Sequence, residues 1–426
     1  MPSFLASVES RIRAAAIIVL ILTVLLLVWM ATDIPSPLPY ANVDFYTYYA
    51  GGVLFNRQQN IYSSDLTAAL LTPLNLPYIP HSDYIYPPYL AMAMSLLSGA
   101  APRVLAFLWG AANLACLALA LFWMADLLVS ADARPRKFWE FLLLALIFLP
   151  TNYALFVGQV NMIVLALMIG AFRWDARQKP IWAGIALGIA ILLKVSPAIL
   201  IAYFIFYRRW KLLAAAFVMV GIVVVGTLPW TLNYDRLFVT EVLPFLSRPQ
   251  AHPVNQSLNG FFSRILTSNV FSVNWIDDPS LSRLFTLGSS ALLTGAALIG
   301  VLLRSRERNL HTPESIPVTA DEVGRSLRPY VMLIAVSVVI SPLAWENLYV
   351  LMVAPLLLLL FQWRQSSQMA RWLTVIAITL MVVQRIWAVH GENPQFVPAL
   401  AQLTLLMSLG LYGALCSIAA LNDRIK

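Results

Sequence analysis

Asp44 is the first side chain in this sequence whose type and surroundings could do chemistry. It lies about a dozen residues beyond the first apolar run and directly before the aromatic segment 45–49. A carboxylate among aromatic rings at the edge of a bilayer loses hydration, which raises its proton affinity and suits it to act as a general base. A simpler interpretation makes Asp44 an ordinary N-terminal residue of a helix over 45–55 that lies along the membrane.

Lys194 is the second such side chain, because apolar segments flank it on both sides. An ammonium group near the hydrocarbon edge is costly and generally has a counter-ion or a function. A lipid phosphate arriving from the outer leaflet would suit it as a partner. The alternative is that the long side chain reaches the membrane surface without any function.

Amides, hydroxyls and aromatic rings follow in four further segments. Amides such as Gln159 and Asn161 can bind sugar hydroxyls, although amides that cap helix ends would look the same. Tyr48 and Tyr86 belong to aromatic segments that also suit an interfacial belt. The polar segment 252–264 could hold a glycan or a phosphate, and the segment 341–347 adds an acid and an indole. The candidate residues of these last two segments are Asn255, Gln256, Arg264, Trp345, Glu346 and Asn347.

The composition determines where such residues must be positioned. Hydrophobic residues make up 60% of the chain and charged residues only 11%, with a mean hydropathy of +0.77. These values are typical of an all-α integral membrane protein, and they exclude a soluble enzyme or one held by a single anchor. About twelve apolar runs are candidate spans. They cover residues 14–31, 103–129, 138–149, 159–173, 180–193, 196–207, 212–230, 284–303, 330–341, 344–363, 372–389 and 397–421.

Clusters of Lys and Arg predict the topology, since basic loops stay on the cytoplasmic side. The net charge of +8 is therefore interpreted as a signal that orients the chain in the membrane, and not as a sign of nucleic-acid binding. We expect a single polytopic domain over residues 1–426 with both termini cytoplasmic, outer-face juxtamembrane helices and an inner loop over 304–328. Two long outer loops, 32–87 and 231–283, would carry the function. A thirteenth crossing depends on residues 86–99, which are treated as partly inserted.

The same clusters require an even number of crossings between successive inner loops. Residues 138–173 and 180–207 must therefore each form a pair of short helices that turns at the outer face. The turns would lie in 150–161 and 194–197, in cavities below the membrane surface. This prediction places Gln159, Asn161 and Lys194 on one side of the membrane.

Seven motifs in this order resemble the integral-membrane glycosyltransferases of family 87, of the GT-C class. The motifs are DFYTYYAGG, a following IY, YIYPPY, GQVN, LKVSPAIL, NQSLNGFFSR and SPLAWEN. Each is weak alone, but the ordered set is specific and runs from about residue 40 to residue 350. One position departs from the pattern, because Asn347 stands where many relatives have a histidine. Asparagine can orient a partner but cannot supply a charged hydrogen bond or a proton, so the substrate or the source of assistance would differ.

The resemblance implies a GT-C fold and a polyprenyl-phosphate sugar donor, with mannose expected as the sugar. It makes Asp44 the catalytic aspartate and Lys194, with Arg264, the candidates for the donor phosphate. The other candidates would bind substrate, and the acceptor would be a glycolipid or envelope glycan at the outer face of a bacterial inner membrane. Direct displacement would invert the anomeric centre.

Two other functional classes and the cofactor question stay open. A lipid or sugar transporter would share the many spans, but it usually has inverted repeats and polar groups at the bilayer midplane. A non-catalytic envelope-assembly subunit would retain the fold alone. We expect no cofactor, no nucleic-acid partner and no His/Cys metal site, while a divalent ion held by carboxylates stays an alternative. The oligomeric state is not predicted.

Overall fold

A computed structural model describes residues 2–30, 32, 40–79, 84–252, 254–272, 274–311, 320–369, 371–376 and 379. Every regular element within these residues is a helix, which confirms the predicted all-α class for the described part of the chain. The candidate span 397–421 and most of 372–389 lie outside the described residues, as does the C-terminus. So does the middle of the predicted inner loop, residues 312–319.

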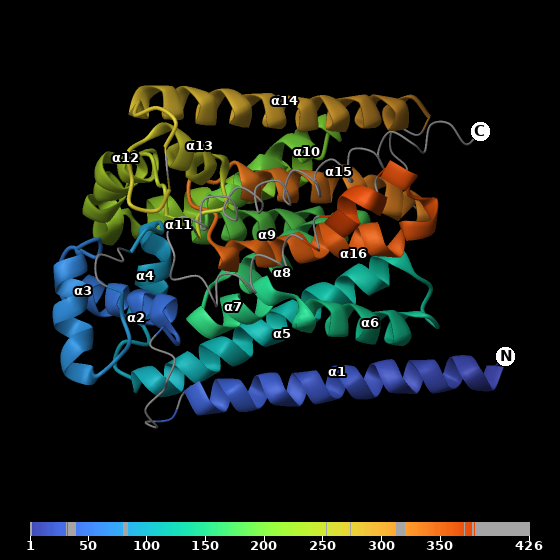
Figure 1. Cartoon of the computed structure of the whole chain (residues 1–426), viewed down its shortest axis with the longest axis horizontal. Coiled ribbons are helices and arrows are strands. Elements are labelled where there is room, and N and C mark those ends of the chain that lie inside the picture. The colour runs from blue at the N-terminus through green and yellow to red at the C-terminus, as the bar shows by residue number, and fades with distance from the viewer. Residues whose placement is uncertain are drawn as a thin grey trace. The chain divides into compact units, whose positions relative to one another are not determined.

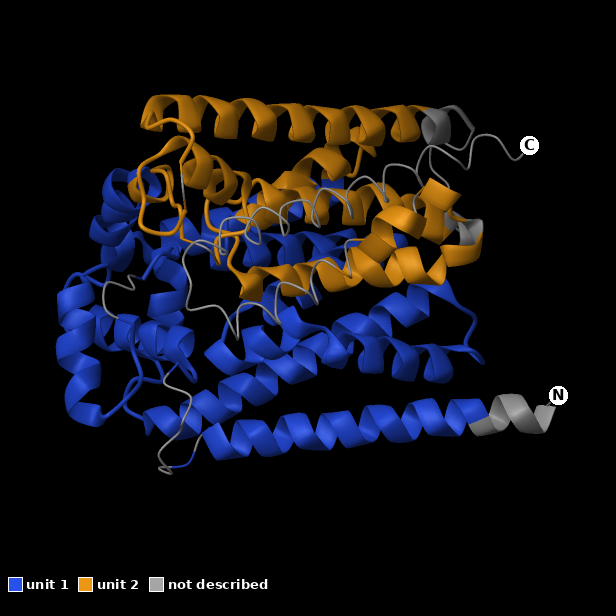
Figure 2. Cartoon of the chain, in the orientation of Figure 1, with its two compact units in different colours: residues 1–195, 211–244 blue, residues 196–210, 245–426 orange. Residues whose placement is uncertain are grey.

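The helices form two compact units, which Figure 2 colours separately. Unit 1 contains residues 1–195 and 211–244, and unit 2 contains residues 196–210 and 245–426. The chain therefore passes from unit 1 to unit 2 and back before it enters unit 2 for the second time. Each unit is described by itself.

Unit 1 packs most of the N-terminal helices around α5 and α8. The first helix α1 lies along α5 and α6, α5 packs on α8, and α8 packs on α9 (Figure 1). The elements are α1 (Pro2–Met30), α2 (Val43–Asn56), α3 (Ser64–Leu71), η1 (Thr72–Leu74), α4 (Pro88–Ser95), α5 (Pro102–Leu128), α6 (Arg134–Ile147), α7 (Leu149–Val157), α8 (Asn161–Ala176), α9 (Pro180–Leu193), α11 (Trp210–Leu237) and the π-helical turn η3 (Phe238–Val242).

Helix α2 packs closely on α4 because a glycine lies at their contact. A Cβ atom added to Gly52 would lie 2.6 Å from the backbone carbon of Met94, a separation that only glycine avoids. Two prolines, Pro87 and Pro88, precede and begin α4, where a missing amide hydrogen costs nothing. The aromatic segment before residue 89 thus leads directly into a helix held against α2.

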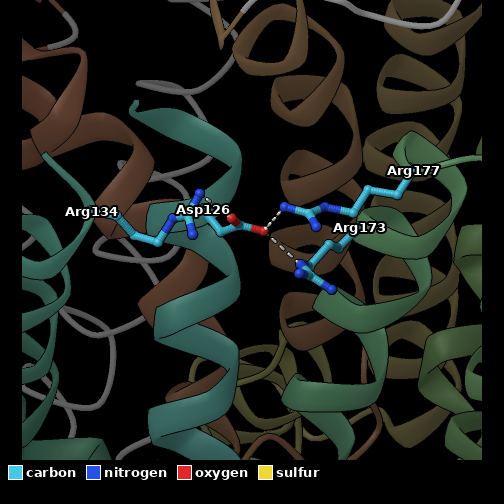
Figure 3. Close-up of polar contacts among 4 residues, drawn as sticks. All are labelled: Asp126, Arg134, Arg173 and Arg177. Carbon is cyan, nitrogen blue, oxygen red and sulfur yellow. Dashed lines mark hydrogen bonds and ion pairs between the residues drawn. The ribbon is translucent and has the colours of Figure 1, made fainter. Parts of the chain in front are cut away.

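The far end of α8 is held by a cluster of charges around Asp126 of α5. The Asp126 side chain is only 1% exposed, and it pairs with Arg134 at 2.8 Å and with Arg173 at 2.8 Å. Arg177 makes a third ion pair with the same carboxylate. Figure 3 shows the three guanidinium groups converging on it from α6 and α8. This cluster ties together α5, α6 and the C-terminal end of α8, while residue 161 begins the other end of α8.

Unit 2 is built around the buried helix α15. In Figure 1, α14 lies above α15, and α10, η4 and α16 also pack on α15. Arg328 of α15 is buried and donates to Gln362 Oε1 at 2.7 Å, so its charge is hydrogen-bonded inside the unit. The elements are η2 (Ser196–Ile199), α10 (Leu200–Phe206), α13 (Leu258–Leu266), α14 (Pro279–His311), α15 (Ala320–Val339), η4 (Glu346–Met352), α16 (Val353–Phe361) and η5 (Trp363–Gln365). The boundary between the two units in the sequence falls within α12 (Leu243–Leu246).

Four helices in the described residues are long and apolar enough to cross a membrane, and a fifth span results if one bent pair counts as one. The four are Val8–Met30, Pro102–Leu128, Trp210–Leu246 and Pro279–Arg306, and the pair α6–α7 bends by 69°. Other apolar helices are shorter, as the parity of basic loops predicts: α9 has 14 residues. These helices make the chain a membrane protein, while the count of twelve or thirteen crossings stays a prediction.

Candidate active site

Asp44 lies in the first turn of α2, where the positive end of the helix dipole favours a negative charge. Asn42 forms the turn before it. Its φ of 57° is left-handed, and its backbone N–H donates to the Phe156 carbonyl at 2.8 Å. Gly158 also has a left-handed φ, of 76°, and a Cβ there would lie 2.7 Å from Cβ of Phe45. The beginning of α2 is thereby held against the turn between α7 and α8.

This packing brings the predicted residue Gln159 to Asp44. Gln159 Nε2 donates to Asp44 Oδ2 at 2.6 Å, across 115 residues of sequence. The Oε1 atom of the same amide accepts from the Tyr48 and Tyr86 hydroxyls, each at 2.9 Å. The Tyr48 hydroxyl also lies 3.1 Å from that of Tyr86. The orientation of the amide is therefore fixed, with its NH₂ group toward the acid and its oxygen toward the two phenols.

The predicted cation Lys194 lies in the same unit and reaches the same group of residues. It follows the last residue of α9, and its Nζ donates to Asn161 Oδ1 at 3.0 Å. Its ammonium group lies 5.5 Å from the centre of the Tyr86 ring, which is cation–π range. Asp44 and Lys194 also interact electrostatically. We call Asp44, Tyr48, Tyr86, Gln159, Asn161 and Lys194 the acid–amide–lysine cluster.

Within the cluster, the neutral side chains are more buried than the two charged side chains. Tyr48, Tyr86, Gln159 and Asn161 are buried, whereas the two charged residues Asp44 and Lys194 are half-buried. The rigid polar groups are thus packed in protein, and each charged residue keeps some accessible surface. The positions of the acid and the ammonium group are fixed by the neutral side chains that they contact.

Desolvation shifts both charged groups toward their neutral forms. Loss of water raises the pKa of Asp44, while the hydrogen bond from Gln159 and the charge of Lys194 each lower it. Desolvation lowers the pKa of Lys194, and the charge of Asp44 raises it. A carboxylate with a raised pKa is a stronger base than an exposed aspartate, and the donors around it keep the ionised form available.

The second predicted group of residues comes together in unit 2. The loop that contains residues 254–257 is hydrogen-bonded to the turn 341–345: Gln256 N donates to the Ala344 carbonyl at 2.8 Å, and Ala344 N donates to Asn255 Oδ1 at 3.0 Å. The Asn255 amide nitrogen lies 3.2 Å from the Pro342 carbonyl. These bonds give Asn255 a structural explanation, because its side chain joins two loops. A role for Asn255 and Gln256 in binding substrate stays a prediction.

Arg264 and Trp345 lie beside the same two loops of unit 2. Arg264 is fully buried, and its Nη1 donates to the carbonyls of Asn255 at 2.9 Å and His252 at 3.2 Å, so it supports this loop from inside. The His252 ring lies 5.2 Å from the half-buried Trp345 ring. Glu346 is half-buried and Asn347 buried at the start of η4. Phosphate binding by Arg264 stays a prediction, as do the roles of these neighbours.

Sequence reasoning missed one acid of unit 1. Asp235, near the C-terminal end of α11, accepts a hydrogen bond from the Tyr89 hydroxyl at 2.9 Å. It belongs to the predicted outer loop 231–283, but nothing in the residues around it distinguishes it from a solvated aspartate. The contact with Tyr89 spans 146 residues, and only the fold brings the two residues together.

No three His, Cys, Asp or Glu side chains lie together as metal ligands in the part of the chain that the structure describes. The question of a divalent ion held by fewer carboxylates stays open. The cluster itself offers one base, one cation and several neutral hydrogen-bonding groups. That set fits a displacement in which a proton leaves one reactant while a negative charge develops on another.

Comparison with known proteins identifies chains similar to this one. The model of glycosyltransferase family 87 matches residues 84–319. A polyprenol-phosphate-mannose-dependent alpha-(1-2)-phosphatidylinositol mannoside mannosyltransferase of Mycobacterium tuberculosis is 28% identical over 349 residues, 78% of this chain and 70% of that protein. A protein of the same description from Mycolicibacterium smegmatis is 23% identical over 377 residues, 85% of this chain and 79% of its own.

A further protein of Mycolicibacterium smegmatis is similar over a shorter region. Its description is polyprenol-phosphate-mannose-dependent alpha-(1-2)-phosphatidylinositol pentamannoside mannosyltransferase. It is 27% identical over 271 residues, which make up 61% of this chain and 60% of that protein. The family match includes Tyr86, Gln159 and Lys194 of the cluster, while Asp44 precedes its first residue.

Proposed function

Since the chain belongs to glycosyltransferase family 87 and is therefore a membrane glycosyltransferase, we propose that it transfers mannose from a polyprenyl-phosphate donor to a glycolipid hydroxyl. The donor and the sugar are suggested by the descriptions of the three relatives, which act on phosphatidylinositol mannosides. A phosphatidylinositol mannoside or a related envelope glycolipid is accordingly the proposed acceptor.

The acid–amide–lysine cluster supports this proposal more than any other observation. The acceptor hydroxyl attacks the anomeric carbon of the donor, and the bond between that carbon and the phosphate oxygen breaks. Asp44 accepts the proton that the hydroxyl loses, and the Lys194 ammonium group stabilises the charge on the departing polyprenyl phosphate. Attack opposite the leaving group inverts the anomeric centre, so a β-linked donor gives an α-linked product.

The proposal includes the setting of the reaction. The cluster is assigned to the outer face of a bacterial inner membrane, in a chain of twelve or thirteen crossings whose two termini are cytoplasmic. The distribution of Lys and Arg supports this topology, because the basic loops then face the cytoplasm. Cysteine labelling at positions 60 and 315 would test it, since the two positions are expected to react from opposite sides of the membrane.

The activity is tested with purified protein, a radiolabelled polyprenyl-phospho-mannose and a phosphatidylinositol mannoside in detergent. The wild type is expected to form a labelled glycolipid. Asp44→Asn retains the shape of the side chain but not its basicity, so it should lose transfer by at least a hundredfold. Asp132→Asn is the matched control, because Asp132 is exposed in the loop between α5 and α6 of the same unit.

Three outcomes count against the proposal. Unchanged turnover in Asp44→Asn removes this residue from the role of base. Transfer from a nucleotide sugar in place of the lipid donor removes the proposed donor. Movement of lipid across vesicles without any labelled glycolipid would favour the transporter alternative.

A further inference from the structure

Three arginines of unit 1 share one buried carboxylate, and two of them remain accessible at the surface. Arg134, Arg173 and Arg177 all pair with Asp126, whose side chain is 1% exposed (Figure 3). The side chains of Arg134 and Arg177 are 29% and 47% exposed, whereas that of Arg173 is 15% exposed. Arg134 pairs with Oδ1 and Arg177 with Oδ2 of the same carboxylate, so their guanidinium groups lie close together. A ligand from outside can therefore reach two neighbouring cations.

Positive charge exceeds negative charge in the segments that carry these arginines. Residues 122–140 and 173–179 contain six basic and four acidic side chains, which leaves a surplus of two positive charges. The first turn of α6 holds Arg134 and two further bases but no acid, and the helix dipole adds positive potential at that end. Glu140, one turn later, pairs with those two further bases. An anion bound at Arg134 and Arg177 would neutralise part of the remaining surplus.

An exposed apolar surface of α5 adjoins the accessible arginines. The Arg134 guanidinium lies 5.9 Å from the centre of the Phe122 ring, and Phe122 is 39% exposed. Leu119, which precedes Phe122 by three residues and so shares its face of α5, is 41% exposed. Helix α5 is long and apolar enough to cross a membrane, so these side chains suit contact with lipid chains. A ligand that joins a phosphate to acyl chains fits both features, whereas free phosphate would contact the arginines alone.

We propose that Arg134 and Arg177 bind the headgroup of an anionic phospholipid whose acyl chains lie against Leu119 and Phe122. Phosphate oxygens accept charge-assisted hydrogen bonds from guanidinium groups, and Asp126 holds the two groups side by side before the lipid arrives. The bound lipid contacts α5, α6 and α8, the three helices that Asp126 already joins, so it stabilises unit 1. No step of the proposed sugar transfer uses this site, which holds a membrane lipid that is neither donor nor acceptor.

The test measures lipid binding to the purified full-length protein by native mass spectrometry in a neutral detergent. Phosphatidylglycerol, which is anionic, and zwitterionic phosphatidylcholine with the same acyl chains are titrated separately. The wild type is expected to bind phosphatidylglycerol at least tenfold more tightly. Arg177→Gln should weaken phosphatidylglycerol binding about fivefold, which is the usual contribution of one basic residue to attraction by an anionic lipid, and should change phosphatidylcholine binding less than twofold. Lys211→Gln is the matched control, because Lys211 is an exposed base at the start of α11 in the same unit.

Equal affinity of the wild type for the two lipids would overturn the assignment. So would a loss in Lys211→Gln as large as that in Arg177→Gln, because the lipid would then respond to surface charge in general. The thermal unfolding midpoint identifies the ligand: phosphatidylglycerol should raise it, and an equal rise with inorganic phosphate would show a site for free phosphate and contradict the lipid.

Two further variants separate charge from folding. Arg177→Lys retains the charge and should retain most of the preference for phosphatidylglycerol. Where Arg177→Gln has a lower midpoint than wild type without lipid, Arg134→Gln replaces it, with the same fivefold loss expected and an unchanged affinity contradicting the site. Because binding is measured without sugar transfer, failure of this proposal leaves the proposed function unaffected.

Discussion

Replacement of Gln159 by leucine would test how the acid–amide–lysine cluster sets the basicity of Asp44. The substitution retains most of the side-chain volume and removes three hydrogen bonds: the donation to Asp44 at 2.6 Å and the acceptance from Tyr48 and Tyr86 at 2.9 Å each. A general base works in its deprotonated form, so activity falls as pH falls through its pKa. A donor to the carboxylate lowers this pKa, and its loss raises it.

The magnitude follows from the single bond to Asp44. A hydrogen bond to a charged group contributes about 1.5 to 3 kcal/mol, and one pKa unit corresponds to about 1.4 kcal/mol. The acidic limb of kcat/KM should therefore move to higher pH by about one to two units in Gln159→Leu. The Tyr48 and Tyr86 hydroxyls lose their acceptor in this variant and can donate to Asp44 instead. Such a bond would again lower the pKa of Asp44, so the shift should lie near one pKa unit.

The assay is the initial rate of sugar transfer at subsaturating donor, measured from about pH 5 to pH 9, because desolvation raises the pKa of Asp44 to about 6 and the substitution should raise it further. Asn113→Leu is the matched control. It removes a buried amide of α5 that donates to the Trp109 carbonyl at 3.1 Å and makes no contact with Asp44. An acidic limb that stays in place in Gln159→Leu, with the protein folded, would refute the idea that this amide sets the basicity of Asp44.

Three other substitutions separate charge, stability and backbone shape. Lys194→Met removes a positive charge that lowers the pKa of Asp44, so the acidic limb should also move to higher pH while donor KM rises; an unchanged donor KM contradicts phosphate binding. Asp126→Asn leaves three arginines without their counter-charge and should cost about 3 kcal/mol in denaturant unfolding, against about 1 kcal/mol or less for the control Glu140→Gln, whose half-buried carboxylate pairs with Arg136 and Lys137. Gly158→Ala forces a side chain into a left-handed turn, so both the thermal midpoint and transfer should fall.

The helices themselves were largely predictable from the sequence, because apolar runs and basic clusters are local signals. The predicted run 103–129 corresponds to α5 at Pro102–Leu128, and the run 180–193 corresponds to α9. The break at Lys194 and the turn at 158–160 were also expected from charge parity. The 69° bend between α6 and α7 was not predicted, because it depends on how the residues around Phe148 pack and on Pro150, two residues later.

The partners of the candidate residues were less predictable. Residue types indicated that Asp44 and Lys194 were unusual, but only the fold shows that Gln159 and Asn161 reach them from one turn. Arg264 illustrates the limit, because a conspicuous cation in a polar loop proves to be buried beneath that loop's carbonyls. Asp235 illustrates the reverse: its hydrogen bond to Tyr89 has no trace in the neighbouring sequence.

The chemistry of the cluster depends on two opposing effects on one carboxylate. Burial alone would raise the pKa of Asp44 until the group was protonated and useless as a base, while donors alone would leave it as weak a base as any exposed aspartate. Gln159 and Lys194 oppose the desolvation, and each is held by a neighbour of its own: Gln159 by two phenols and Lys194 by Asn161. Because Gln159 and Asn161 flank a single residue at the start of α8, one turn positions both the donor to the base and the support of the cation. A small movement of that turn would therefore change the basicity of Asp44 and the position of Lys194 together.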